Sequence, residues 1–301
     1  MANIIFMGTP EFAVPSLRAL HHTFGVNTVV TVPDKAKGRG LTHTPSDVKV
    51  AALDLGITDI LQPTSLKDPA FSEAIAERSP DIICVIAFRI LPRSVYSTAR
   101  LGAFNVHASL LPRFRGAAPI NHAIMEGDAE SGVTSFLLND VVDTGTILLR
   151  RSLPIADGMT AGDLYASLMP LAAECAVETC TGLLAGTLSP MPQDETAATP
   201  APKVFRETSG IDWTRPRRIV RNFVHGLSPT PCAWTSWNGQ TLKVYRASFV
   251  DASGTPGSWT IRDGRILAFC ADGALSLDEV QLPGKRRMAA EEIVRGYRGP
   301  T

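Results

Sequence analysis

The sequence has little that would place the chain in a specialised class. Aromatic residues make up 7% and charged residues 19% of its 301 positions, while hydrophobic residues make up 45%, which is typical of a globular protein. No apolar run approaches the roughly 20 residues of a membrane helix, and the N-terminus lacks the basic, apolar and small-residue parts of a signal peptide. We therefore expect a cytoplasmic protein that does not enter a membrane.

Several motifs of enzyme chemistry are also missing. The five cysteines form no Cys-x-x-Cys pair, so we expect buried, reduced thiols. The histidines have no spacing such as His-Glu-x-x-His, and we expect no metal. No Gly-x-Ser-x-Gly marks a nucleophilic serine. The first apolar run leads into Gly8-Thr9-Pro10 and not into the Gly-x-Gly-x-x-Gly fingerprint of a dinucleotide site.

The first half of the chain alternates apolar runs with helical segments. Continuous apolar strands are predicted at 3–7, 28–32, 57–62, 82–87 and 103–106, and helices at 11–20, 45–55, 67–78 and 92–99. This alternation favours an α/β fold with a doubly wound parallel sheet, whose ligands bind beyond the carboxyl ends of the strands. Further elements are predicted near 117–126 (helix), 133–138 and 146–150 (strands) and 160–185 (helix).

The rest of the chain has a different pattern. The stretch 186–203 contains four prolines and predicts an extended linker. A helix follows at 215–226, and short strands separated by turns are predicted at 232–237, 241–249, 257–262, 265–270 and 274–281. Such a series is typical of a small antiparallel barrel.

The net charge of zero hides an asymmetry between the two parts. Residues 203–301 carry 15 Lys and Arg against 9 Asp and Glu, whereas residues 1–202 carry 14 against 20. A basic C-terminal part suits a polyanion such as a nucleic acid, although an ordinary solvated surface also gives such an excess.

The densest polar cluster follows the strand predicted at 103–106. Asn105 and His107 are two residues apart, so a strand places both side chains on one face. Two neighbouring polar groups need partners when buried, which favours a catalytic pair over a structural one. Asp143-Thr144-Gly145 is either an ordinary turn or the source of a carboxylate that orients His107. The basic loop 35–44 is either a solvated loop or a clamp on phosphates.

These residues belong to a series of motifs that resembles the 10-formyltetrahydrofolate-dependent formyltransferases, above all the methionyl-tRNA formyltransferases. The motifs, in chain order, are Gly8-Thr9-Pro10-Glu11-Phe12, Gly38-Arg39-Gly40, Asn105-Val106-His107, Ser109-Leu110-Leu111-Pro112, Arg115-Gly116, Asp143-Thr144-Gly145, Gln193-Asp194-Glu195 and Ile211-Asp212-Trp213. Departures include the segment Ala87–Pro92, which is one residue shorter than in the family and carries Arg89.

The resemblance implies a Rossmann-like folate-binding and catalytic domain over 1–189, a linker over 190–206 and an OB-like tRNA-binding domain over 207–301. It assigns catalysis to Asn105, His107 and Asp143. The tetrahydrofolate-contacting residues it implies are Ser109, Leu110, Leu111 and Pro112. Candidate phosphate contacts are Lys35, Lys37 and Arg39 in the basic loop, and Arg217, Arg218, Arg221, Lys285, Arg286 and Arg287 in the C-terminal part.

The implied reaction moves a formyl group from 10-formyltetrahydrofolate, the co-substrate, to the methionine of initiator methionyl-tRNA, and we expect a monomer. His107 acts either as a base or as a donor to the oxyanion, and the residues alone leave both roles open. Three alternatives remain: an amino-sugar nucleotide N-formyltransferase, a formyltetrahydrofolate hydrolase and a non-catalytic tRNA-binding module.

Overall fold

The computed structural model describes residues 2–37 and 42–296, and these residues form two compact units. Unit 1 consists of the described residues within 1–116, 132–153 and 166–200. Unit 2 consists of those within 117–131, 154–165 and 201–301. Each unit therefore draws on three stretches of the chain. The domain boundaries expected at residues 189 and 206 remain a prediction.

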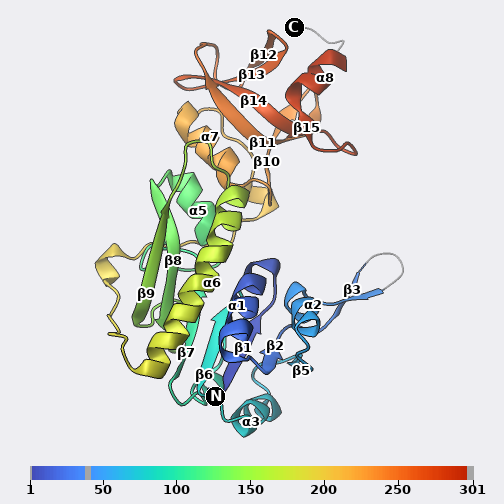
Figure 1. The fold of residues 1–301 in the computed structure, drawn as a ribbon. Helices are drawn as coiled ribbons and strands as arrows, with labels where there is room; N and C mark the ends of the chain where they lie inside the picture. Colours follow the sequence, from blue (N-terminus) through green and yellow to red (C-terminus); the bar gives the residue numbers. More distant parts are fainter. Residues whose placement is uncertain (1, 38–41, 297–301) are drawn as a thin grey trace. The chain divides into compact units, whose positions relative to one another are not determined.

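Unit 1 is built on a mixed sheet that is parallel over most of its width (Figure 1). Its strands lie in the order β5-β2-β1-β6-β7-β8-β9. The strands are β1 (Ile4–Gly8), β2 (Thr28–Val30), β5 (Asp59–Leu61), β6 (Ile82–Ile86), β7 (Gly102–His107), β8 (Glu130–Leu137) and β9 (Ile147–Pro154). The pairs from β5 to β7 are parallel, and β8 runs antiparallel to β7.

The central strands are apolar along their whole length because both faces of the sheet are covered. Every residue of β1 and of β6 is buried. The helices between the strands are α1 (Val14–Phe24), after the short η1 (Glu11–Ala13), then α2 (Asp47–Asp54), α3 (Pro69–Glu77) and α4 (Arg93–Tyr96). The predicted Rossmann-like α/β domain is confirmed.

The order of the strands reverses beside β1. The chain proceeds from β1 outward to β2 and β5, then returns to β6 on the opposite side of β1. In an open α/β sheet, ligands bind in the crevice at such a switch point, beyond the carboxyl ends of the strands. The loops after β1, β6 and β7 are therefore where a site is expected.

A hairpin that the sequence did not predict interrupts this pattern. Strands β3 (Lys35–Lys37) and β4 (Thr42–Thr44) pair in antiparallel fashion within the basic loop. Lys35, one of the candidate phosphate contacts, is exposed there. The Gly38-Arg39-Gly40 motif lies outside the described residues, as does the side chain of Lys37.

Helix α6 (Ala161–Ala185) is the longest helix of the described chain. By length and composition alone it could cross a membrane, which the sequence analysis did not foresee. That is a weak indication, because the core helix of a soluble protein meets the same criterion. Its buried residues Leu168, Ala172 and Cys175 recur three or four positions apart, as on a helix face that packs on a core. Thr179 Oγ1 donates a 2.7 Å hydrogen bond to Ser135 Oγ of β8.

Unit 2 contains an antiparallel sheet in the order β10-β11-β14-β13-β12, with β15 paired to β14. The strands are β10 (Ala233–Trp237), β11 (Gln240–Val250), β12 (Trp259–Arg262), β13 (Arg265–Cys270), β14 (Gly273–Gln281) and β15 (Met288–Ala289). The helices are α5 (Pro119–Glu126), α7 (Arg217–Gly226), α8 (Ala290–Gly296) and the short η3 (Arg206–Thr208). The prediction of a separate antiparallel domain is confirmed.

Tight turns connect strands of this sheet, and one face of helix α7 packs against it. Asn238 and Asp263 have φ of 51° and 50° and each precedes a glycine, which is the backbone of a tight hairpin turn. Val220 and Val224 of α7 are buried in the same core cluster as strand residues such as Leu242. All five cysteines of the chain are buried and free, as predicted.

Candidate active site

Two polar side chains lie at the carboxyl end of β7. Asn105 and His107 share one face of the strand, as the alternation of the sequence predicted. His107 is buried and Asn105 is half-buried. The described residues provide no hydrogen bond to the Asn105 carboxamide. Because partly buried amides are ordinarily paired, this carboxamide is well placed to bind a ligand.

The hydrogen bonds of His107 determine which ring nitrogen carries a proton. Nε2 lies 2.8 Å from the carbonyl oxygen of Phe114. A carbonyl oxygen only accepts, so Nε2 is the protonated nitrogen. Nδ1 faces Asp143, with 3.9 Å between Nδ1 and Oδ2, which is too long for a direct hydrogen bond. In the neutral form of the ring, the lone pair is therefore on Nδ1, which faces Asp143.

A tight loop between β8 and β9 positions Asp143. The backbone of Asp143 is left-handed, with φ of 57°. Gly145 passes so close to β8 that a Cβ atom there would lie 1.6 Å from the carbonyl oxygen of Leu137, so only glycine fits. Asp143 Oδ2 accepts a 2.9 Å hydrogen bond from the backbone N–H of Gly116. The motif is thus a tight turn that also brings the Asp143 carboxylate to face His107. The catalytic role of Asp143 stays a prediction.

The segment predicted as a linker supplies a buried side chain, Gln193, to which the sequence analysis assigned no role. Gln193 Nε2 donates to the carbonyl oxygens of Asp143 and Gly145, at 2.9 Å each. Its Oε1 accepts from Arg115, at 3.0 Å from Nε and 2.8 Å from Nη2. Arg115 also pairs with Glu195. The only signal in the sequence was the Gln193-Asp194-Glu195 motif, which gave no partner for the glutamine.

The segment predicted to contact tetrahydrofolate folds back on itself. Ser109 is fully buried, and its hydroxyl donates to the carbonyl oxygen of Arg113 at 2.7 Å. Leu111 is buried in a small cluster with Phe136, and the Leu111-Pro112 peptide is cis. Leu110 and Pro112 remain partly exposed. Of the four predicted residues, these two offer side-chain surface to a ligand, whereas Ser109 and Leu111 shape the loop.

Arg89 explains how the shortened segment after β6 is held. Its Nη1 and Nη2 donate to the carbonyl oxygens of Thr64 and Pro63, at 3.1 and 2.7 Å. Its guanidinium also lies 5.3 Å from the ring centroid of Phe88. Burial lowers the pKa of Arg89 from its ordinary value. Arg89 thereby ties the loop after β6 to the loop after β5, at the edge of the sheet where the site lies.

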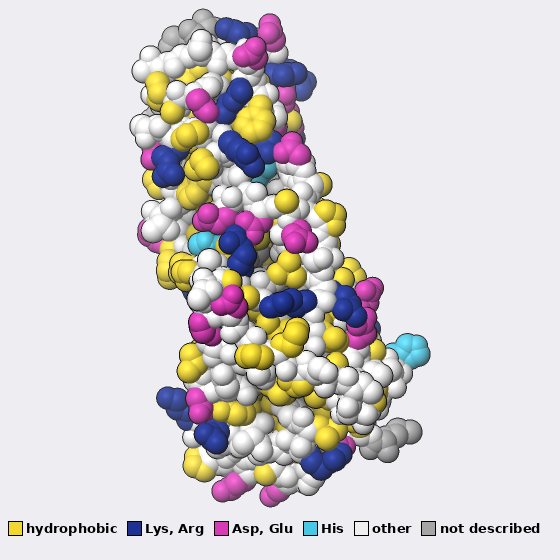
Figure 2. Space-filling model, turned by 90° about the vertical axis from the view of Figure 1, so that its left-hand side faces the viewer, with side chains coloured by type: hydrophobic (Ala, Val, Ile, Leu, Met, Phe, Trp, Pro, Cys, Tyr) yellow, Lys and Arg dark blue, Asp and Glu magenta, His cyan; other side chains and the backbone are white. Residues whose placement is uncertain are grey.

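On the face drawn in Figure 2, Lys and Arg side chains are interspersed with Asp and Glu side chains. Most of the cations expected to meet a polyanion in the C-terminal part have partners within unit 2. Arg217 and Arg221 lie over the ring of Phe249, and Arg221 also pairs with Asp157. Arg286 and Arg287 pair with Glu292 and Glu279 respectively. The side chains of Arg218 and Lys285 form no ion pair with the described residues.

The site contains an amide donor, an imidazole lone pair and a carboxylate, which suits acyl transfer to an amine. The amide can stabilise an oxyanion and the imidazole can accept a proton. No three His, Cys, Asp or Glu side chains gather as a metal-binding group within residues 2–37 and 42–296.

Comparisons with known proteins agree with this chemistry. The Formyl transferase family matches residues 2–180, and the Formyl transferase C-terminal domain matches residues 203–298. The methionyl-tRNA formyltransferase of Chlorobium luteolum is 47% identical over 305 residues, covering 98% of this chain and 97% of that protein. The methionyl-tRNA formyltransferase of Bacteroides thetaiotaomicron is 41% identical over 309 residues, covering 98% and 96%.

Solved structures share the fold at lower identity. An N-formyltransferase from Helicobacter canadensis, in complex with folinic acid and dTDP-3-aminofucose, has a TM-score of 0.71 at 18% identity and covers 92% of this chain and 99% of that chain. The methionyl-tRNA formyltransferase from Clostridium thermocellum has a TM-score of 0.59 at 17% identity and covers 94% and 99%.

The parallel sheet with its polar cluster and the separate antiparallel domain define a two-domain formyl transferase. The chain belongs to the formyl transferase family, and the curated relatives described above, which span its length, are methionyl-tRNA formyltransferases.

Proposed function

We propose that the protein transfers a formyl group from N10 of 10-formyltetrahydrofolate to the α-amino group of methionine on initiator tRNA. The observation that carries this proposal is the position of His107 Nδ1, 3.9 Å from Asp143 Oδ2, together with the carboxamide of Asn105, to which the described residues provide no hydrogen bond. The curated relatives with 41–47% identity over 98% of the chain support the same acceptor.

Asn105 stabilises the oxyanion that forms when the amine attacks the formyl carbon. The attack converts the carbonyl oxygen into an oxyanion and leaves a positive charge on the attacking nitrogen. A preorganised amide N–H next to that oxygen lowers the barrier, and loss of such a donor costs on the order of 10²–10³ in rate. The carboxamide of Asn105, to which the described residues provide no hydrogen bond, is positioned to act in this way.

His107 removes the proton from the attacking amine. Its Nε2–H is bound to the Phe114 carbonyl, so Nδ1 is the nitrogen that can accept a proton. The resulting imidazolium faces the carboxylate of Asp143, which offsets the new positive charge. The hydrogen-bond geometry therefore favours the base role over that of an oxyanion donor. The bond between the formyl carbon and N10 then breaks, and N10 of tetrahydrofolate ends with the proton.

The remaining roles follow from where the residues lie. The folate is held by the loop of Ser109, Leu110, Leu111 and Pro112, with side-chain contacts from Leu110 and Pro112. Residues 1–189 carry folate binding and catalysis, 190–206 connect, and 207–301 bind the tRNA. Its tRNA substrate is cytoplasmic, so the enzyme acts in the cytoplasm and not at a membrane. It acts as a monomer, and no step above requires a metal.

Formylation of charged initiator tRNA, with charged elongator methionyl-tRNA as the specificity control, tests the proposal. We expect single-turnover rates to fall by about 10²–10³ in Asn105→Ala, through loss of the oxyanion donor. In His107→Ala they should fall by about 10²–10⁴, through loss of the base. Folate binding, measured by equilibrium titration, should persist in both. The exposed His22 of α1 provides a matched control, and His22→Ala should react at the wild-type rate.

Two further substrates make the assay discriminating. Formylation of an amino-sugar nucleotide without formylation of the tRNA would replace this proposal with the sugar enzyme, whose fold this chain shares. Release of formate in the absence of any acceptor would indicate a hydrolase. Wild-type turnover in either the Asn105 or the His107 variant would remove that residue from the mechanism.

A further inference from the structure

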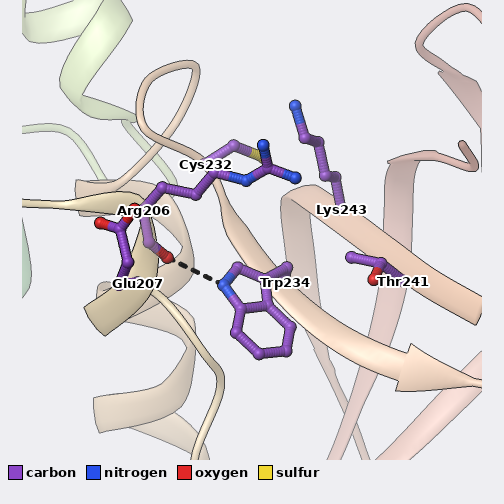
Figure 3. A pocket seen from close by; sticks show the side chains of 6 residues that line it. All are labelled: Arg206, Glu207, Cys232, Trp234, Thr241 and Lys243. Carbon is purple, nitrogen blue, oxygen red and sulfur yellow. Dashed lines mark hydrogen bonds between the residues drawn. The ribbon is translucent and has the colours of Figure 1, made fainter.

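Unit 2 contains a pocket that no part of the catalytic mechanism uses (Figure 3). Its volume is about 270 Å³ and it is open to solvent, which puts it near the lower limit of small-ligand sites. It is lined by Arg206, Glu207, Cys232, Trp234, Thr241 and Lys243. These residues come from η3, β10 with the residue before it, and β11.

Strand pairing places two of the lining side chains next to each other. Trp234 of β10 lies directly opposite Lys243 of β11 in the antiparallel register. Directly opposed residues point to the same face of a sheet and lie within contact distance. Thr241 is two residues before Lys243 and lies on that face as well. The indole, the ammonium and the hydroxyl therefore form one continuous wall.

Arg206 is fixed above this wall by the backbone. The indole Nε1 of Trp234 donates a 3.0 Å hydrogen bond to the carbonyl oxygen of Arg206. The backbone N–H of Trp234 donates at 3.0 Å to Ser209, which follows η3. Figure 3 shows the Arg206 guanidinium extending between Cys232 and Lys243, while Glu207 points away from Lys243.

The pocket has two positive charges in its lining, and Glu207 is the one acidic residue beside them. Neither the Arg206 nor the Lys243 side chain forms an ion pair with the described residues. Two like charges at one site repel each other, and an anion between them relieves that repulsion. A guanidinium fork beside an ammonium is a common arrangement for binding a phosphate.

The floor of the pocket is neutral. Cys232 is buried, and its Sγ lies 3.5 Å from the carbonyl oxygens of Ala233 and Val244. Burial raises the pKa of the Cys232 thiol, so the thiol stays uncharged and does not repel an anion. An uncharged floor, two cations and a half-exposed indole together match a phosphate joined to an aromatic ring.

We propose that this pocket binds one nucleotide of the tRNA, with its phosphate between Arg206 and Lys243 and its base against Trp234. This inference rests on the proposed function, because it assigns the pocket to the same tRNA. A base within a duplex is stacked on its neighbours, so the bound nucleotide belongs to a single-stranded part of the tRNA. Stacking of a base on an aromatic side chain contributes about 1–3 kcal/mol.

The test measures the affinity of the full-length protein for initiator tRNA across a series of salt concentrations. Arg206→Gln and Lys243→Gln should each weaken binding, and each should reduce the slope of log K against log salt by about 1. Trp234→Leu should weaken binding by about 5- to 150-fold, whereas Trp234→Phe, which keeps a stacking surface, should recover most of that loss. Arg262→Gln, at an exposed arginine on β12, is the matched control and should bind as the wild type does.

Two outcomes would overturn the assignment. Unchanged affinity and salt slope in both Arg206→Gln and Lys243→Gln would show that no phosphate binds there. Tight binding of free nucleoside monophosphates or inorganic phosphate, lost in Lys243→Gln while tRNA affinity stays constant, would assign the pocket to a small ligand. Wild-type formylation is measured in parallel. If the wild-type protein does not formylate the tRNA but the pocket variants still lose tRNA affinity, the proposed reaction is wrong and the pocket assignment stands.

Discussion

At the scale of single residues, the backbone carbonyls of Asp143 and Gly145 have the carboxamide of Gln193 as a hydrogen-bond donor. That amide binds both carbonyls, and Arg115 binds its oxygen. An unpaired buried carbonyl costs about 1–3 kcal/mol, so the loop that carries Asp143 would rearrange without this side chain. We infer that Gln193 is a positioning residue for Asp143.

Replacing Gln193 tests that role. Gln193→Ala should lower kcat by about 10²-fold, because misplacement of a reacting group by about 1 Å has that effect. Gln193→Glu keeps the acceptor for Arg115 but loses both donors, and it should not restore kcat. The measurement is steady-state formylation with KM determined separately for folate and tRNA. Met191→Ala, at an exposed side chain of the same segment, is the control. Full activity in Gln193→Glu would contradict the role of the two donors.

At the scale of elements, α7 is joined to β11 by a buried histidine. His225 Nε2 accepts a 3.2 Å hydrogen bond from the backbone N–H of Ala247. Burial, followed by the charges of Arg221 and Arg246, lowers the pKa of His225 from 6.5 to about 4. The folded protein therefore keeps His225 neutral at pH values where the unfolded chain binds a proton.

This difference predicts an acid-sensitive unit 2. The contribution of neutral His225 to the free energy of unfolding is complete above pH 6.5 and is lost as the pH falls toward 4. The total loss is about 3 kcal/mol. All four tryptophans lie after residue 201, so their fluorescence in urea reports on the unfolding of unit 2. The variant His225→Gln should lose less stability than the wild type between pH 7 and pH 4. If the free energy of unfolding falls equally with pH in the two proteins, another group causes the acid sensitivity.

At the scale of the whole molecule, the basic balance of residues 203–301 overstates the charge available to a polyanion. Four of the six arginines and lysines named from the sequence are held by acidic or aromatic partners. Only Arg218 and Lys285 among the six lack an ion pair or ring contact with the described residues. Fewer counterions are then released on binding than the sequence count suggests.

Salt-dependent binding measures this directly. Initiator tRNA affinity should fall as salt rises, and Arg218→Gln and Lys285→Gln should each reduce the slope by about 1. Arg286→Gln should change the slope less, because Glu292 already neutralises that arginine. Binding that does not respond to salt would contradict a phosphate-based interface. An equal effect of all three substitutions would show that the ion pair of Arg286 opens on binding.

The sequence alone determined the elements and part of the site. Apolar runs and helical periods are local, so the parallel strands, the hairpin turns and the antiparallel domain could be predicted within a few residues. The shared face of Asn105 and His107 follows from the period of a strand. The residues alone left the role of Asp143 open, and the resemblance assigned it to catalysis. The structure places Asp143 Oδ2 3.9 Å from His107 Nδ1.

Only the tertiary structure decided the contacts between distant segments. Gln193 lies 50 residues from Asp143, and the sequence predicted an extended linker there because prolines and small polar residues are typical of one. Strand register brought Trp234 opposite Lys243, and ion pairs neutralised most of the counted cations. Local patterns specify elements, whereas hydrogen bonds and ion pairs between those elements depend on how the folded chain brings them together.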